Sequence, residues 1–193
     1  MAVAIPFLIW DQIFTTNGVW GFNEDYLQGL FIGELPLEEV LFFFVIPYCC
    51  LFIYEVLNAY FPNTSLHRLT MIASIFIVLS GVLMALTHLD HWYTLSACGL
   101  AALIVVFVMQ QRYIWYPRAV FAYVVALLPF FIVNGILTGA LTDEPVVWYS
   151  QAHITGIRLG TIPLEDMYYN FALLIPIIGI YHFLKVRSLR SSK

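Results

Sequence analysis

Apolar stretches separated by short polar segments form the dominant pattern of this chain. Five of the stretches are long enough to cross a membrane as helices, roughly 37–60, 69–87, 92–109, 119–141 and 164–184. At about 1.5 Å per residue, each of these predicted helices matches a hydrocarbon layer about 30 Å thick. A shorter apolar stretch before Asp11, continuing toward Phe14, predicts a sixth span that looks incomplete. The pattern therefore predicts an all-α integral membrane protein with about six transmembrane helices.

The composition supports a membrane protein and argues against a soluble domain. Hydrophobic residues make up 62% of the 193 residues and charged residues only 10%, whereas soluble domains average about 25% charged residues. A chain of this composition is suited to a bilayer rather than to one small soluble core. The first ten residues lack the basic segment and cleavage site of a signal peptide, so we interpret them as part of a spanning helix. We expect membrane lipid around the protein and no nucleic acid as a partner.

The positions of lysine and arginine predict the orientation in the membrane. If the predicted spans alternate in direction, seven of the eight basic residues fall on one side, and Arg158 falls on the other. Basic residues accumulate on the cytoplasmic side of membrane proteins. We therefore predict a multi-pass protein of the cell membrane with both termini in the cytoplasm. The seven residues are Arg68, Arg112, Arg118, Lys185, Arg187, Arg190 and Lys193.

A sequence motif that occurs twice indicates an internal repeat. Residues 29–39 (GLFIGELPLEE) align with residues 156–166 (GIRLGTIPLED), and nine of the eleven aligned pairs are identical or conservative. Upstream of the motif, Asp11 aligns with Asn134. The loop between this upstream position and the motif is four residues longer in the second copy than in the first.

The topology predicts how the two repeats are related. Three spans lie between the two helices that follow the motif, so both helices cross the membrane in the same direction. The halves are therefore predicted to be parallel repeats related by an axis along the membrane normal. We assign residues 1–66 to the first repeat, 67–90 to a linking transmembrane helix and 91–193 to the second repeat. The first repeat has no counterpart of the span 92–109, so either the chain is truncated or a partner supplies that helix; a homo-oligomer is a further alternative.

The repeated motif places acidic residues at the start of two membrane helices. Proline followed by acids is an ordinary helix start in a single copy. Two copies near or inside the apolar layer, where a charge costs at least about 2.5 kcal/mol, indicate function. Burial favours the protonated acid and the helix N-terminus favours the carboxylate, and the sequence leaves this balance open. The candidates are Pro36, Glu38 and Glu39 in the first copy and Pro163, Glu165 and Asp166 in the second.

Helix geometry limits which of these acids can face one cavity. Adjacent residues on a helix point about 100° apart, so one member of each acidic pair is expected to be the acid and the other its supporting neighbour. A carboxylic acid kept protonated in an apolar pocket is a competent general acid. Asp11 and Asn134 are expected to support the motif helices or to cap the cavity.

Aromatic residues surround both motifs. Packing and an interfacial aromatic belt explain many of them, but an aromatic wall can also stabilise a carbocation. The candidate substrate-binding residues are Trp20, Phe42, Phe43, Tyr168, Tyr169 and Asn170. The cluster of His88, Asp90 and His91 lies in a short interfacial loop, and we expect no metal site there.

Several activities are disfavoured by motifs that the sequence lacks. There is no Gly-x-Gly-x-x-Gly fingerprint for a flavin or nicotinamide cofactor, and we expect no cofactor. The only lysines, Lys185 and Lys193, lie in the tail, so a retinal Schiff base within the membrane is excluded. No Asp-x-x-Asp pair is present to hold magnesium and a diphosphate, which argues against a prenyltransferase.

The chain resembles the lycopene cyclase domain family. The resemblance rests on residues 10–23 (WDQIFTTNGVWGFN), 35–44 (LPLEEVLFFF) and 47–49 (PYC), and it covers essentially the whole chain, with a more diverged second half. It implies a lycopene β-cyclase, an intramolecular lyase or isomerase. The linear end of lycopene is protonated, a neighbouring double bond attacks the cation, and loss of a proton gives a β-ring without net oxidation. Cyclisation of both ends gives β-carotene through γ-carotene.

The resemblance also suggests residue roles. The family's Pro-x-Glu-Glu/Asp motif falls on the two acidic motifs, so Glu38, Glu39, Glu165 and Asp166 become candidate proton donors and acceptors. Fused members usually begin with a further hydrophobic helix, which this sequence lacks. The alternatives are a cyclase of a C50 carotenoid and, in another class, a non-catalytic membrane transporter or carotenoid-binding protein.

Overall fold

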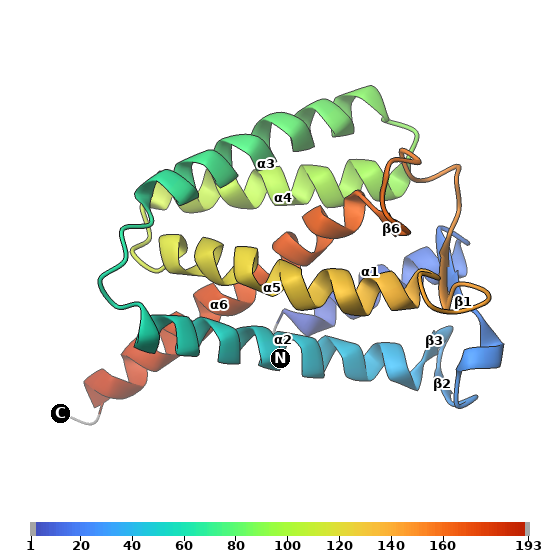
Figure 1. Cartoon of the computed structure of the whole chain (residues 1–193), viewed down its shortest axis with the longest axis horizontal. Coiled ribbons are helices and arrows are strands. Elements are labelled where there is room, and N and C mark those ends of the chain that lie inside the picture. The colour runs from blue at the N-terminus through green and yellow to red at the C-terminus, as the bar shows by residue number, and fades with distance from the viewer. Residues whose placement is uncertain (1–2, 192–193) are drawn as a thin grey trace.

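The computed structural model describes residues 3–191 and forms a bundle of helices with short strands gathered at one end (Figure 1). The helices are α1 (Ala4–Thr16), α2 (Leu37–Tyr60), α3 (His67–Thr87), α4 (Trp92–Gln111), α5 (Tyr116–Leu137) and α6 (Glu165–Ser191). The strands are β1 (Trp20–Phe22), β2 (Phe31–Ile32), β3 (Leu35–Pro36), β4 (Val147–Tyr149), β5 (Arg158–Leu159) and β6 (Ile162–Pro163), with a 3-10 turn at Glu24–Tyr26. Two basic residues were used to predict the orientation but lie outside what the structure describes. They are Lys193 and the side chain of Arg190.

The helices confirm the predicted all-α membrane fold. Within residues 3–191, the five helices α2 to α6 are long and apolar enough to cross a membrane. Helix α1 has 13 residues, which gives a length of about 20 Å and is too short for a full crossing. Helix α5 ends at Leu137 rather than near residue 141, because Gly139 adopts a φ of 100° and Thr138 donates its hydroxyl back to the Asn134 carbonyl.

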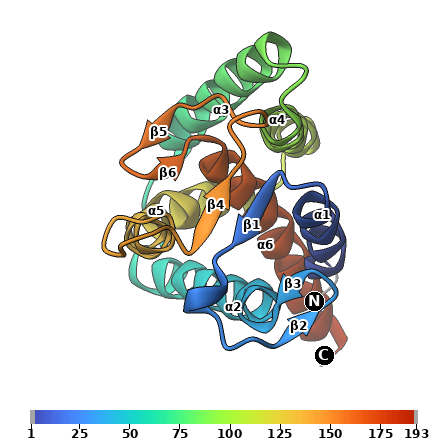
Figure 2. The same ribbon diagram turned by 90° about the vertical axis from the view of Figure 1, so that its right-hand side faces the viewer.

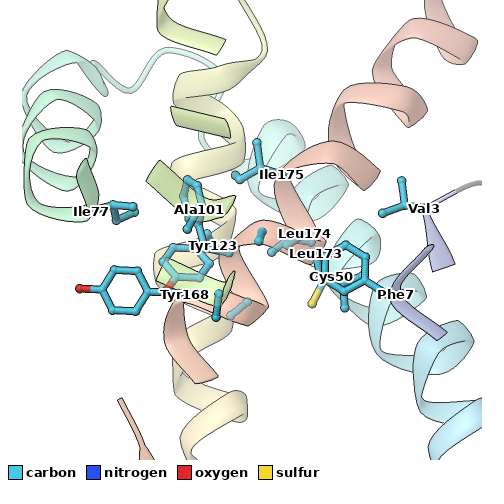
Figure 3. Packing of buried hydrophobic residues seen from close by; sticks show 14 of the residues in the cluster. Val3, Phe7, Cys50, Ile77, Ala101, Tyr123, Tyr168, Leu173, Leu174 and Ile175 are labelled. Carbon is cyan, nitrogen blue, oxygen red and sulfur yellow. The ribbon is translucent and has the colours of Figure 1, made fainter. Parts of the chain in front are cut away.

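Helix α6 runs through the middle of the bundle and carries much of the buried core. Figure 3 shows Leu173 and Leu174 of α6 with Phe7 and Cys50 on one side and Tyr123 on the other. Helix α4 packs along both α3 and α6, and its small side chains Ala97, Ala101 and Ala102 are all buried. Small residues let helices approach closely in a membrane. The first turn of α6 is therefore held at a fixed position within the bundle.

Strands β1 and β4 pair with each other across the two sequence halves. Figure 2 looks onto this end of the bundle and shows the pair at the centre, with the hairpins β2–β3 and β5–β6 on opposite sides. The pairing is antiparallel and places Trp20 opposite Tyr149, Gly21 opposite Trp148 and Phe22 opposite Val147. When the motif alignment is extended upstream without a gap, Gly21 is the counterpart of Trp148, so the pair is centred on a pseudo-two-fold axis.

The hairpins in front of α2 and α6 have matching geometry. In each hairpin a two-residue turn begins with a glycine, Gly33 or Gly160, whose φ is 67°. A two-residue turn that begins with positive φ is typical of tight β-hairpins, and glycine adopts this conformation without a steric penalty. The backbone N–H of Leu37 donates to the carbonyl of Leu30, and that of Leu164 donates to Ile157, at 2.8 and 3.0 Å. The division of the chain into two repeats stays a proposal, and these paired contacts support it.

Candidate functional site

A cavity of about 150 Å³ lies among α2, α5 and α6, beneath the β1–β4 pair. Most of its lining is apolar or aromatic, but Asp11, Glu39 and Asp166 also line it. Asp11 comes from α1, Glu39 from the first turn of α2 and Asp166 from the first turn of α6. The two motif helices, which are far apart in sequence, therefore each contribute a carboxyl group to the same cavity.

The Asp166 carboxyl group accepts hydrogen bonds at both oxygens. The Tyr93 hydroxyl donates to Oδ1 at 2.6 Å. The Tyr149 hydroxyl and the Asn134 amide donate to Oδ2 at 2.9 and 3.0 Å. Hydrogen bonds to a charged acceptor are stronger than those to a neutral one. This set of donors therefore fixes the orientation of Asp166 and matches a carboxylate.

Tyr149 lies in β4, outside the membrane-spanning helices. Burial, followed by the nearby Asp166 and then Glu39, raises the pKa of Tyr149 well above its usual value. Loss of its proton would place a second negative charge beside Asp166 in a medium of low polarity. The phenol therefore remains a hydrogen-bond donor to Asp166.

Asp11 and Glu39 form a second pair of polar groups on the other side of the cavity. The Trp20 indole N–H donates to Asp11 Oδ1 at 2.7 Å, and the Thr15 hydroxyl lies 3.5 Å from the same oxygen. Asp11 Oδ2 is buried and has no donor in the part of the chain that the structure describes, if both carboxyl groups are ionised. Asp11 and Glu39 nevertheless face the same cavity from the neighbouring helices α1 and α2. A proton on one of the two carboxyl groups would give Asp11 Oδ2 a partner.

Glu38 and Glu165 do not line the cavity and instead hold the hairpins in front of their helices. The backbone N–H of Gln28 donates to Glu38 Oε1 at 2.8 Å, and that of Thr155 donates to Glu165 Oε1 at 2.6 Å. These two contacts occupy equivalent positions in the motif alignment. Glu165 is fully buried and also accepts a hydrogen bond from the Thr94 hydroxyl at 2.6 Å. The outer acid of each motif therefore organises the helix start, while the next acid faces the cavity.

Aromatic rings form one wall of the cavity. The rings of Trp20 and Tyr93 have centroids 4.9 Å apart, and those of Tyr93 and Tyr149 are stacked at 5.9 Å. Tyr169 packs against Trp10 at 5.0 Å and against Trp20 at 6.1 Å. Aromatic faces attract positive charge. The wall can therefore stabilise a cation that forms inside the cavity.

The cavity reaches the outer surface of the bundle on one side. Cys49, Pro129 and Val133 line it and are exposed between α2 and α5. In the alignment of the two halves, α1 corresponds to α5 and α2 to α6, so the opening between α2 and α5 corresponds to the space between α1 and α6. There Phe7 packs against Tyr169, with ring centroids 5.2 Å apart. A hydrophobic molecule in the membrane can thus approach the carboxyl groups from the α2–α5 side.

The family model for lycopene cyclase matches residues 1–57 and 90–184. The chain belongs to the lycopene cyclase family. This membership confirms the resemblance found in the motifs and supports a carotenoid cyclase activity. The segment between the two matched stretches contains α3. No curated protein sequence and no solved structure matches this cyclase chain.

The predicted site residues of the cyclase fall into two groups. Glu39, Asp166, Asp11, Asn134, Trp20, Phe42, Tyr169 and Asn170 line the cavity. Phe43 is buried in the bundle core outside this lining. Tyr168 points toward α3 and donates its hydroxyl to Ser80 at 2.7 Å. Pro36 and Pro163 are buried at the ends of β3 and β6, directly before the two motif helices.

The sequence reasoning missed several polar residues of the cyclase site, namely Tyr93, Thr94 and Tyr149. Tyr93 and Thr94 lie at the start of an apolar span and carry no motif. Tyr149 becomes the counterpart of Phe22 when the motif alignment is extended into β1 and β4, so that extension would have identified its position. The hydroxyl that differs between Phe22 and Tyr149 is the group that contacts Asp166.

Proposed function

We propose that this chain closes β-rings on the linear ends of lycopene and gives β-carotene through γ-carotene. The reaction is an intramolecular, non-redox cyclisation of the lyase or isomerase class. The observation that carries the proposal is a small apolar cavity into which Glu39 and Asp166 project from the two motif helices, against an aromatic wall. Acid-initiated cyclisation needs a proton donor, a counter-charge for the cation and little water, and a mainly apolar cavity lined by these carboxyl groups suits all three needs.

The chemistry follows from the groups that face the cavity. A carboxylic acid gives its proton to the terminal double bond of the substrate, and the neighbouring double bond attacks the resulting cation. The cation then loses a proton from a ring carbon to a carboxylate. Aromatic rings such as Trp20 and Tyr169 face the space where positive charge develops. Each group acts in its ordinary chemical role, and we assign no step to a cofactor.

The volume of the cavity supports cyclisation of one end at a time. A dry apolar cavity of about 150 Å³ holds a single ring of benzene size. It can therefore hold one end of a C40 chain, while the rest of the molecule extends through the opening between α2 and α5 into the lipid. The product with one ring must then leave and return with its other end. We expect γ-carotene to accumulate before β-carotene.

The prediction of a further helix beside the first repeat gains support from burial. Val45 and Tyr48 of α2 are 54% and 72% exposed, whereas their counterparts Ala172 and Ile175 of α6 are fully buried beside α4. A helix placed against α2 as α4 is placed against α6 would cover this apolar face. Whether a partner or a homo-oligomer supplies such a helix stays a prediction. The cytoplasmic location of both termini also stays a prediction, and it would place the cavity toward the opposite side of the membrane.

Pigment chromatography of lycopene-accumulating bacteria that express this chain tests the proposed function. We expect new γ- and β-carotene, and we expect the double variant Glu39→Gln/Asp166→Asn to leave lycopene unchanged while it still inserts into the membrane. The matched control is Asp90→Asn, which changes an exposed loop acid far from the motif helices in sequence. Lycopene left unchanged by a correctly inserted wild-type chain, also when it is joined to a further transmembrane helix, would contradict the proposal. Conversion of a C50 carotenoid instead would assign the longer substrate.

A further inference from the structure

We propose that Asp11 and Glu39 share one proton and together act as the acid of the site, while Asp166 is a fixed carboxylate that balances the charge of the cation. This inference rests on the proposed function, because it assigns roles to groups in the same cavity. It adds Asp11 to the acids of the repeated motifs as a catalytic residue. It also removes Asp166 from the set of proton donors.

The contacts of Asp11 support a shared proton. One oxygen, Oδ1, is occupied by the Trp20 indole N–H at 2.7 Å. The other oxygen, Oδ2, is buried and lacks any donor among the described residues unless Glu39 carries a proton. Asp11 and Glu39 face the same small, mainly apolar cavity, where two carboxylates repel each other, and one proton shared by the pair removes this repulsion. The indole contact stabilises negative charge on Asp11, so the proton resides mainly on Glu39.

The second repeat provides an internal comparison for this pair. Asn134 is the counterpart of Asp11, and Asp166 is the counterpart of Glu39. The Asn134 amide donates to Asp166 at 3.0 Å, whereas the aligned residue in the first repeat, Asp11, carries a carboxyl group. An amide donor next to a carboxyl group needs no shared proton. The difference between Asp11 and Asn134 therefore helps to distinguish a pair that holds a proton from a carboxylate that accepts hydrogen bonds.

The reaction balances with these roles. The O–H bond of Glu39 breaks, and a C–H bond forms at the terminal double bond of the substrate. The cation is then attacked by the next double bond, which forms the C–C bond of the ring. Finally a C–H bond beside the new cation breaks, and its proton returns to the pair of Asp11 and Glu39. The substrate gains and loses no electrons, and the pair ends each turnover with the proton that it held at the start.

Infrared spectroscopy of the full chain in lipid vesicles, combined with ring formation from lycopene, tests this assignment. The difference spectrum between the wild type and Asp11→Asn should contain the band of a protonated carboxylic acid, because an amide at position 11 lets Glu39 ionise. The same band should appear in the difference spectrum for Glu39→Gln, and it should be absent from that for Asp166→Asn. We expect Asp11→Asn to reduce ring formation by at least about 100-fold, the lower end of the effect of a general acid.

Two controls separate a chemical role of Asp11 from a structural one. Asp11→Glu retains a carboxyl pair and should recover part of the lost rate, and Asp90→Asn, in an exposed loop, should change neither the band nor the rate. If the wild type closes rings and Asp11→Asn keeps both the band and the rate, the inference is wrong and the proposed function stands. If the band behaves as expected but the wild type closes no ring, even when it is joined to a further transmembrane helix, the pair holds a proton and the proposed function fails.

Discussion

The two tyrosines that contact Asp166 should contribute unequally to activity. Tyr93 donates to Oδ1 at 2.6 Å, and no other donor reaches this oxygen within the described residues. Tyr149 donates to Oδ2 at 2.9 Å, but Asn134 donates to the same oxygen at 3.0 Å. Loss of Tyr149 therefore leaves Oδ2 with a donor, while loss of Tyr93 leaves Oδ1 without one.

The expected magnitude follows from the value of a hydrogen bond to a charged group. Such a bond contributes about 1.5–3 kcal/mol to stabilisation of the ionised carboxylate. If activity depends on ionised Asp166, Tyr93→Phe should reduce the rate of ring formation roughly 10- to 150-fold, because about 1.4 kcal/mol corresponds to a factor of ten. Tyr149→Phe should reduce it by roughly tenfold or less, since the remaining amide compensates in part.

The assay is conversion of lycopene by purified chain in vesicles, with carotenoids separated by chromatography and the amount of folded protein measured in parallel. Tyr168→Phe is a matched control, because this tyrosine donates to Ser80 on α3 and lies outside the cavity lining. A larger loss for Tyr149→Phe than for Tyr93→Phe would refute the reasoning, and so would wild-type rates for both.

Three further predictions concern the packing around the site. Gly21→Ala should lower both the melting temperature and the rate of ring formation, because a Cβ at this position overlaps the Trp148 indole. If this overlap is the cause, adding Trp148→Ala to the same chain should restore part of the stability. Glu165→Gln should lower the free energy of unfolding by about 0.5–1.5 kcal/mol, because it replaces the fully buried carboxyl group that accepts hydrogen bonds from Thr94 and Thr155; a chemical melt without any shift would contradict the contacts described. Val133→Trp should slow the conversion of lycopene, because the indole fills the opening between α2 and α5. Ile132→Trp, on the exposed outer side of α5, should not slow it. Equal rates for the two variants would show that lycopene reaches the cavity by another route.

The helices could be predicted from the sequence because apolar length decides membrane insertion. Only the helix ends needed local information: Gly139 and Thr138 end α5 earlier than the apolar pattern suggests. The two similar hairpins were also visible in the sequence as a repeated motif, in which Gly33 and Gly160 occupy aligned positions and both adopt a positive φ. These features depend on residues that are close in sequence.

The composition of the site could be predicted only in part. Helix geometry showed that one acid of each motif faces the cavity, but the rotation of α2 and α6 that selects Glu39 and Asp166 comes from packing against other helices. Tyr93 and Tyr149 reach Asp166 from α4 and β4, and periodicity within either element says nothing about this meeting. The role proposed for Asp11 was likewise hidden, because an isolated acid near a helix end is usually a structural residue.

The centre of the β1–β4 pair determines whether the two halves are interchangeable. Gly21 faces its own counterpart, Trp148, across the pseudo-two-fold axis. Two copies of the first half would set glycine against glycine and would lack the indole that covers Gly21. Two copies of the second half would place a Cβ where the indole now lies and would displace it. An unlike pair of halves therefore fits this contact better than two like halves, whether the halves are joined in one chain or produced as separate subunits.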